Sequence, residues 1–290
     1  MKTLLSLLLV LISIASYSED VPILVSAQWL NEHKSDPKLV ILQVSFLQYD
    51  YDNEHIPGAH YLWPSWLAPD SPQGSMNQPD PKTATSYLQG WGVNNDSHVV
   101  VCHIRGEVSP SARMFLMLEN LGLKGKVSFL NGGLEAWKKE GYPVTKEIPV
   151  AKKGNFVVKP GNLVVDRSYV LKTIDSDKGV IVDARAKNWY DGDPTGNPRD
   201  GHIKSAKNIP YQDMLDQASY TFKTVDQLSG YFTPVLPDKN KEVVTYCFIG
   251  QTASVVYMSG RILGYDMKLY DGSMQEWSRI AELPMESNKK

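Results

Sequence analysis

A single cysteine, Cys247, occupies a position suited to nucleophilic chemistry. The apolar run 243–245 predicts a buried strand, and a helical pattern follows Thr252. Unpaired backbone N–H groups at the start of a helix stabilise an anion, and the helix dipole adds to this effect. We therefore expect the Cys247 sulfur to be a thiolate near neutral pH, which is the form of cysteine that attacks as a nucleophile.

The loop from Cys247 to Thr252 is six residues long and fits around one anionic atom. Gly250 can adopt the left-handed conformation that turns successive N–H groups toward one point, as in a backbone nest. A threonine hydroxyl at the end of the loop adds another donor. The sequence therefore predicts an anion-binding cradle that consists of Phe248, Ile249, Gly250, Gln251 and Thr252.

The elements that must hold this loop occur twice. Residues 40–45 match residues 180–185, and residues 130–137 match residues 270–277, both at an offset of 140 positions. In each copy, short apolar runs alternate with longer helical patterns, which predicts a parallel sheet with helices on both faces. Ligands bind at the carboxyl ends of the strands in such sheets. The predicted fold class is α/β, with two domains of the same architecture.

The boundaries of the two copies follow from composition. We expect an N-terminal domain over residues 24–146 and a C-terminal, catalytic domain over residues 164–287. Residues 147–163 between them contain two prolines, two glycines and two adjacent lysines, which is typical of a semi-stiff linker on the surface.

Residues 1–18 have the layout of a cleaved secretory signal. Lys2 precedes an apolar run from Leu4 to Ile14, and small residues follow the run. The run is too short for a stable membrane span. We therefore expect an exported protein, periplasmic or secreted, without stable membrane insertion after the signal is cleaved; the alternative is an uncleaved N-terminal anchor.

The composition excludes several classes of protein. The 30 basic and 32 acidic residues give a net charge of -2, and no basic run exceeds two residues, so no nucleic-acid partner is expected. Two cysteines cannot make a disulfide scaffold or a four-thiolate zinc site, and the histidines match no common metal-binding spacing. A cysteine phosphatase needs an arginine six positions after its nucleophile, where this chain has Ala253.

The sequence resembles the tandem-domain members of the rhodanese family of sulfurtransferases. The resemblance covers about residues 24–287 and rests on four motifs in order: 183–185 (Asp-Ala-Arg), 201–203 (Gly-His-Ile), 247–252 (the cysteine loop) and 270–277 (Tyr-Asp-Gly-Ser to Glu-Trp). It implies two rhodanese-like domains and a double displacement in which Cys247 takes a sulfur atom as a persulfide. It further implies a small-molecule sulfur donor, a cyanide or thiol acceptor (a protein thiol included), and neither metal nor organic cofactor.

The resemblance leaves the sulfur donor open between two molecules. Family members that use thiosulfate carry basic residues after the nucleophile, and those that use 3-mercaptopyruvate carry small polar ones; Phe248 and Ile249 match neither pattern. An arginine of the family aligns with Asn188 and is therefore lost. We expect thiosulfate as the donor, Arg199 as its side-chain contact, and Arg185 either beside the donor or in a salt bridge with an acidic neighbour.

The first copy departs from the pattern of the second. Gln43 and Ser45 replace the Asp and Arg, and His103 stands near the position of the nucleophile, with Cys102 one position earlier. We expect this domain to be non-catalytic and Cys102 to be a buried apolar residue; the alternative is a resolving thiol or disulfide partner of Cys247. A protein that holds a persulfide or an anion without turnover is the second function that the sequence allows.

Overall fold

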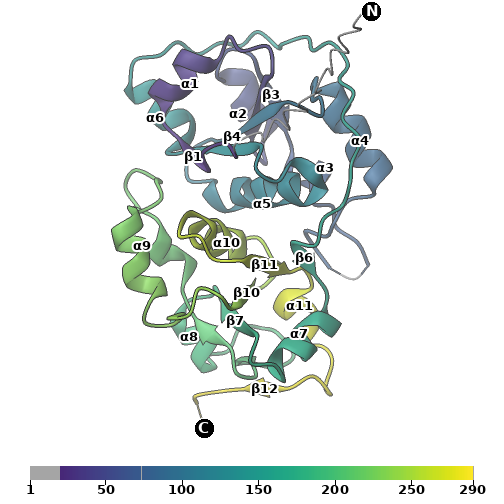
Figure 1. Ribbon diagram of the computed structural model, residues 1–290, viewed down its shortest axis with the longest axis vertical. Coiled ribbons are helices and arrows are strands. Elements are labelled where there is room, and N and C mark those ends of the chain that lie inside the picture. The colour runs from purple at the N-terminus through teal and green to yellow at the C-terminus, as the bar shows by residue number, and fades with distance from the viewer. Residues whose placement is uncertain (1–19, 73, 290) are drawn as a thin grey trace, which may run out of the picture.

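The computed structural model describes residues 20–72 and 74–289 and contains two parallel, five-stranded sheets (Figure 1). The strands of the first sheet lie in the order β1-β5-β4-β2-β3, and those of the second in the order β6-β11-β10-β7-β9. The two orders are the same once the short β8 is set aside, so the repeat in the sequence is a repeat of topology. Together these sheets and their helices confirm the predicted fold class.

The bounds of the strands are as follows. The first sheet contains β1 (Leu24–Val25), β2 (Leu39–Val44), β3 (Ala59–Leu62), β4 (His98–His103) and β5 (Val127–Leu130). The second contains β6 (Val164–Val165), β7 (Gly179–Asp183), β9 (Lys207–Asn208), β10 (Glu242–Tyr246) and β11 (Met267–Tyr270). A separate antiparallel pair joins β8 (His202–Ile203) to β12 (Met285–Glu286).

Helices cover both faces of each sheet. The N-terminal domain has α1 (Ala27–His33), α2 (Gln48–Asn53), α3 (Pro64–Leu67), α4 (Pro81–Gly90), α5 (Val108–Leu118) with a π-helical extension (Glu119–Leu123), and α6 (Gly133–Lys139). The C-terminal domain has α7 (Arg167–Ile174), α8 (Lys187–Asp191), a 3-10 helix (Tyr211–Met214), α9 (Val225–Phe232), α10 (Ala253–Ile262) and α11 (Ser273–Trp277). Among these described helices, none is long and apolar enough to cross a membrane.

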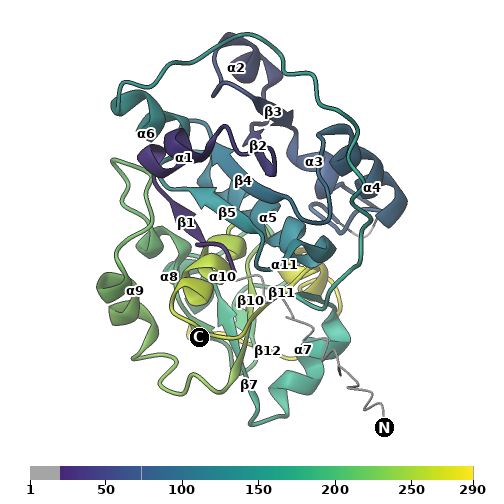
Figure 2. The same cartoon turned by 45° about the horizontal axis from the view of Figure 1, so that its top comes forward.

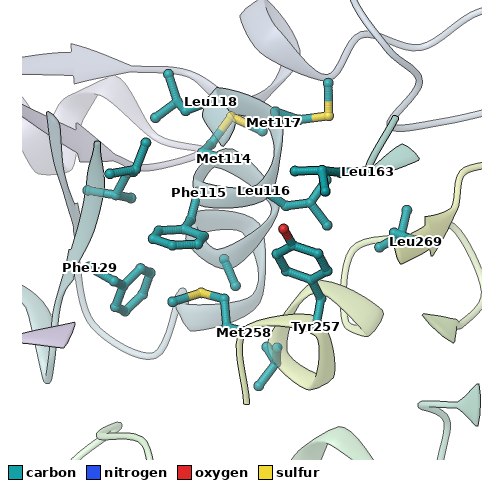
Figure 3. Packing of buried hydrophobic residues seen from close by; sticks show 14 of the residues in the cluster. Met114, Phe115, Leu116, Met117, Leu118, Phe129, Leu163, Tyr257, Met258 and Leu269 are labelled. Atoms are coloured by element: carbon teal, nitrogen blue, oxygen red, sulfur yellow. The ribbon is translucent and has the colours of Figure 1, made fainter. Parts of the chain in front are cut away.

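Three hydrophobic cores result from this layering. One outer core lies between the first sheet and the α1 and α6 helices, and another between the second sheet and the α7 and α11 helices. The third is shared, because α5 and α10 pack against each other between the two sheets. Figure 3 shows Phe115 and Leu116 of α5 close to Tyr257 and Met258 of α10. Since a buried side chain of this size contributes about 1.5–3 kcal/mol, separating the two domains would be costly.

The segment between the domains runs along the outside of the N-terminal domain before it enters β6 (Figure 2). Its backbone is tied down at several points, for example from Gly154 N–H to the Gln89 carbonyl at 2.8 Å and from Phe156 N–H to the Val93 carbonyl at 3.1 Å. Phe156 is buried. The connection is therefore held against the first domain along its length.

Candidate active site

Cys247 follows the last residue of β10, and strand alternation decides where its side chain points. Val244 and Tyr246 belong to the outer core of the C-terminal domain, whereas Val243 and Cys247 belong to the core that the two domains share. The cysteine is a free thiol and is only 1% exposed. The sulfur therefore lies at the carboxyl end of a central strand and on the side of the sheet that faces the N-terminal domain.

The backbone of Cys247 is fixed by the turn that precedes α11. Its N–H donates to the Ser273 hydroxyl at 3.3 Å, and its carbonyl accepts from the Met274 N–H at 3.0 Å. The Ser273 hydroxyl in turn donates to the Tyr270 carbonyl at 3.0 Å. Ser273 is buried and has a φ of 49°, an uncommon conformation for a residue other than glycine. A strained and hydrogen-bonded turn of this kind holds the nucleophile in one position.

The loop after the cysteine curls back on itself before α10 begins. Gly250 has a φ of 80°, and its carbonyl accepts a hydrogen bond from the Ser254 hydroxyl at 3.0 Å. Throughout residues 20–72 and 74–289, no acceptor takes a hydrogen bond from the backbone N–H groups of residues 248–251. These are the free donors that an anion cradle requires.

The start of α10 differs from those of α7 and α9 and resembles those of α5 and α11, which also lack a side-chain cap. The helices α7 and α9 begin at Asp166 and Thr224, whose side chains accept hydrogen bonds from the first turn. Thr252 stands at the equivalent place in α10 but makes no such hydrogen bond through its side chain. In the first turn of this ten-residue helix, the Ser254 and Val255 N–H groups donate to the Gln251 and Thr252 carbonyls at 3.1 Å, and Ala253 is the first-turn residue whose N–H makes no such bond within the described residues.

Arg185 forms a salt bridge with the acidic neighbour Asp183, which is one of the two roles expected for it from the sequence. Its Nε lies 3.0 Å and its Nη2 2.6 Å from the two carboxylate oxygens of Asp183, and Tyr246 donates its hydroxyl to the same carboxylate at 2.8 Å. Burial alone would lower the pKa of Arg185, but the hydrogen bonds and negative charge of Asp183 raise it overall, with a smaller contribution from Cys247. The guanidinium is thus charged and paired with Asp183, next to Tyr246 on the outer face of the sheet.

Arg185 also contacts the cysteine loop through the Phe248 ring. Its Nη1 is buried and has no hydrogen-bond partner among the described residues. Its Cζ lies 5.1 Å from the centre of the Phe248 ring, and that ring packs edge-on against Trp189 at 5.1 Å. The half-buried Ile249 packs against the shared core. Phe248 packs against the outer core of the C-terminal domain, so the two apolar side chains of the loop lie against different cores.

Gln251 connects the loop to the N-terminal domain. Its Nε2 donates to the hydroxyl of Ser109, in the first turn of α5, at 2.9 Å. Gln251 and Thr252 are both half-buried. The loop is therefore lined by both domains.

Arg199 has a different role from the predicted donor contact. Its five guanidinium N–H groups donate to five backbone carbonyls around the end of α11, those of Trp277, Ser278, Ile280, Ala281 and Leu283, at 2.5 to 3.3 Å. Arginine has no further N–H to offer a ligand. The Arg199 side chain caps the C-terminal end of α11, where the helix dipole favours a cation. Asn188, which aligns with a family arginine, is exposed on α8.

Among the described residues of the first copy, no cysteine follows a strand end as Cys247 does. Cys102 lies within β4, in the outer core of its domain, and burial raises its pKa far above the usual range of a thiol. Burial also lowers the pKa of His103, whose ring packs on Phe129, to about 4. Cys102 and Cys247 are both free thiols in separate cores, so the disulfide pairing is not formed. Within the described part of the chain, no cluster of side chains suited to a metal ion is present.

The role of Ser273 and the partner of Gln251 were not predicted from the sequence. Ser273 belongs to the motif at residues 270–277. Its hydrogen bond with the Cys247 N–H depends on a turn that forms only in the folded protein. Gln251 was assigned to the cradle, and its bond to Ser109 joins residues 142 positions apart. No local pattern marks such a pair, because the contact exists only once the two domains have packed.

The described residues form a tandem-domain protein with two parallel α/β domains and one free thiol, Cys247, directly after a strand end between them. The family model of the rhodanese-like domain matches residues 26–140 and again residues 166–280, so the chain belongs to the rhodanese-like domain family. This confirms the resemblance seen in the sequence.

The chain is similar in sequence to three relatives of similar length, which have different names. The chain is 31% identical over 278 residues to the sulfur carrier protein TtuD of Thermus thermophilus, covering 91% of this chain and 96% of that one. It is 30% identical over 280 residues to the 3-mercaptopyruvate sulfurtransferase of Escherichia coli, covering 91% and 98%. It is 29% identical over 278 residues to the thiosulfate sulfurtransferase of Rattus norvegicus, covering 89% and 92%.

Solved structures show the same fold. A structure of the anaerobic ergothioneine biosynthesis enzyme from Chlorobium limicola, in complex with trimethyl histidine, aligns with a TM-score of 0.81 at 20% identity. The alignment covers 92% of this chain and 71% of that one. The tandem arrangement of the two domains is therefore shared with an enzyme of distant sequence.

Proposed function

We propose that this protein is a sulfurtransferase in which Cys247 carries the transferred sulfur as a persulfide. The observation that supports this most is the free thiol at the end of β10, with unpaired N–H groups at residues 248–251 and an uncapped α10 beside it. A persulfide places its negative charge on the outer sulfur, and converging N–H groups stabilise such a charge. The named relatives at about 30% identity support the same class of reaction.

The first half of the reaction loads the enzyme. The Cys247 thiolate attacks the outer sulfur of thiosulfate, a new S–S bond forms, and the S–S bond of the donor breaks with its electron pair leaving on sulfite. The products are the Cys247 persulfide anion and sulfite, and no proton or external electron is needed. The cradle supplies hydrogen-bond donors to the forming persulfide.

The second half of the reaction regenerates the Cys247 thiolate. A cyanide ion attacks the outer sulfur of the persulfide, the S–S bond breaks, and thiocyanate leaves while Cys247 regains its negative charge. A thiol acceptor, small or on a protein, takes the sulfur in the same way as a persulfide of its own. One thiol and a ring of donors complete this cycle, so no metal or organic cofactor has a step in it.

3-Mercaptopyruvate is the second candidate for the donor, and the apolar side chains of the cysteine loop favour it. The dianion of thiosulfate is costly to desolvate at Phe248 and Ile249 unless paired charge replaces its water. Arg199 offers no such charge, because its N–H groups are all bonded. With this donor, sulfur again passes to Cys247, the C–S bond breaks, and the thiol proton ends on the methyl group of pyruvate.

Steady-state kinetics test the proposal. Thiocyanate formation is followed with cyanide as acceptor and with each donor in turn, on reduced protein. Parallel lines in the double-reciprocal plots, which indicate a covalent enzyme intermediate, are expected for the donor that the enzyme uses. Loading of sulfur without turnover by cyanide or by any thiol would instead favour a protein that only holds a persulfide.

We also propose export to the periplasm or the outside of the cell. The proposal rests on residues 1–18, which lie outside the described residues. Expression of the full chain in a bacterial host, followed by fractionation and N-terminal mass measurement, tests it. A mature protein that begins near residue 19 in the exported fraction is expected, and an intact Met1 in the cytosol would contradict export.

A further inference from the structure

Gln275 of α11 connects the cysteine loop to the other domain. Its backbone N–H donates to the Phe248 carbonyl at 2.9 Å. Its side-chain amide makes two hydrogen bonds to the backbone of Ser75: the Ser75 N–H donates to Oε1 at 2.8 Å, and Nε2 donates to the Ser75 carbonyl at 3.0 Å. One half-buried residue therefore holds the loop on one side and the N-terminal domain on the other.

Ser75 lies in the segment between α3 and α4, and the shape of this segment fits Gln275 closely. Gly74 has a φ of 157°, and a Cβ placed on it would lie 2.5 Å from the Gln275 side-chain amide carbon. The backbone of the next residues continues the contact, since the Gln78 N–H donates to Asp271 Oδ2 at 3.3 Å. Residues 74–78 thus lie against the turn that carries Asp271 and α11.

Arg113 of α5 supports the same turn from the shared core. Its side chain is fully buried, and its Nη2 bonds both the Asp271 carboxylate and the Met76 carbonyl. A Cβ placed on Gly250 would lie 3.3 Å from Arg113 Nη1 and 3.5 Å from the Asp271 carbonyl. Arg113 and Asp271 therefore stand directly behind the cysteine loop, where they limit how far Gly250 can move.

We propose that residues 74–78 and Arg113 of the N-terminal domain clamp the cysteine loop in its anion-binding shape, and that Gln275 is the positioning residue through which this clamp acts. The inference rests on the proposed function of the loop. Donors stabilise a charge only when they are held within a few tenths of an ångström of the productive geometry. The domain that lacks a nucleophile thereby contributes to the reaction through the other domain.

Gln275→Ala tests the clamp, with Gln89→Ala as the matched control. Gln89 is also half-buried and donates its Nε2 to a backbone carbonyl, that of Phe156 at 3.0 Å, but it lies on α4 next to the connecting segment. Both variants lose side-chain hydrogen bonds of similar kind. We expect Gln275→Ala to lower the rate of Cys247 alkylation by iodoacetamide threefold to tenfold at neutral pH, from the ordinary strength of the lost bonds.

Two further readouts separate positioning from general destabilisation. The pH profile of alkylation should move to higher pH in Gln275→Ala, because displaced donors stabilise the thiolate less, and should stay unchanged in Gln89→Ala. Hydrogen exchange should become faster at the amides of residues 248–255 and remain unchanged in the strands β2 to β4. Gln275→Glu keeps the acceptor for the Ser75 N–H and should recover part of the alkylation rate.

Two alkylation results would contradict the proposed clamp. Alkylation of Gln275→Ala within twofold of the wild-type rate, with the same pH profile, would do so. Equal losses in Gln275→Ala and Gln89→Ala would do so as well, because they would point to stability alone. Alkylation needs no sulfur donor, so these results stand apart from the proposed function, which is tested by sulfur uptake and turnover of the wild-type protein.

Discussion

Replacing Gly250 by alanine tests how strictly the cysteine loop must keep its shape, and Gly264 supplies the control. The two glycines have φ values of 80° and 81°. A Cβ on Gly264 would meet nothing within 4 Å, whereas a Cβ on Gly250 would meet Arg113 Nη1 at 3.3 Å and Leu269 Cδ2 at 3.4 Å. The backbone cost is therefore the same at both positions, and only Gly250→Ala adds crowding at the site.

The size of the effect follows from this comparison. Placing a residue with a Cβ in the left-handed region costs about 1–2 kcal/mol, so Gly264→Ala should lose that much in free energy of unfolding. Gly250→Ala should lose at least as much, because Arg113 lies in a core that cannot move freely. A loop rotated away from Arg113 no longer aims its N–H groups at the sulfur. Sulfur loading should then fall at least tenfold in Gly250→Ala alone.

Urea unfolding measures the first quantity, and the rate of sulfur uptake at a temperature where both variants are fully folded measures the second. The reasoning would be refuted if Gly250→Ala loaded sulfur as fast as Gly264→Ala. It would also be refuted if both variants lost loading equally, because left-handed strain at the far end of α10 should not reach the cysteine.

Three further predictions concern residues outside the loop. Cys102→Ser should keep most of the sulfur-transfer activity, because Cys102 lies in a separate core; a loss of more than tenfold in activity would restore the resolving-thiol hypothesis. His103 is held neutral with a pKa of about 4, so the unfolded chain binds more protons between pH 4 and 6.5 and the free energy of unfolding should fall as the pH decreases through this window, by about 3 kcal/mol from this group. Urea unfolding at pH 4.5 and 7 should show this dependence, and His103→Asn should flatten it. Arg199→Met should cost about 2–4 kcal/mol of stability through the five lost hydrogen bonds while the Michaelis constant for the donor stays the same; a raised Michaelis constant at unchanged stability would return Arg199 to the donor site.

The features that the sequence predicted depend on neighbouring residues. The apolar run 243–245 and the glycine at position 250 are local signals, and they placed the thiol at a strand end followed by a curled loop. The repeat added the second sheet, because equal patterns fold into equal topologies. These signals suffice for the fold class and for the position of the Cys247 thiol at the end of β10.

The features that the sequence did not predict depend on distant partners. Arg199 was assigned to an anionic ligand on charge alone, but the carbonyls at the end of α11 satisfy it 78 to 84 positions away. Gln275 and Ser75 are 200 positions apart and meet only across the domain interface. A single sequence gives no sign of such contacts, since each needs both domains in place.

The most direct test of the account is to locate the transferred sulfur on the protein. Reduced wild-type protein is incubated briefly with thiosulfate or 3-mercaptopyruvate, then blocked, digested and examined by peptide mass spectrometry, with Cys247→Ser beside it. The account predicts one added sulfur atom on the peptide that contains Cys247, removed by cyanide, and none on the variant, whose unfolding curve should match that of the wild type. Added sulfur on Cys102, or loading and turnover that persist in Cys247→Ser, would contradict it.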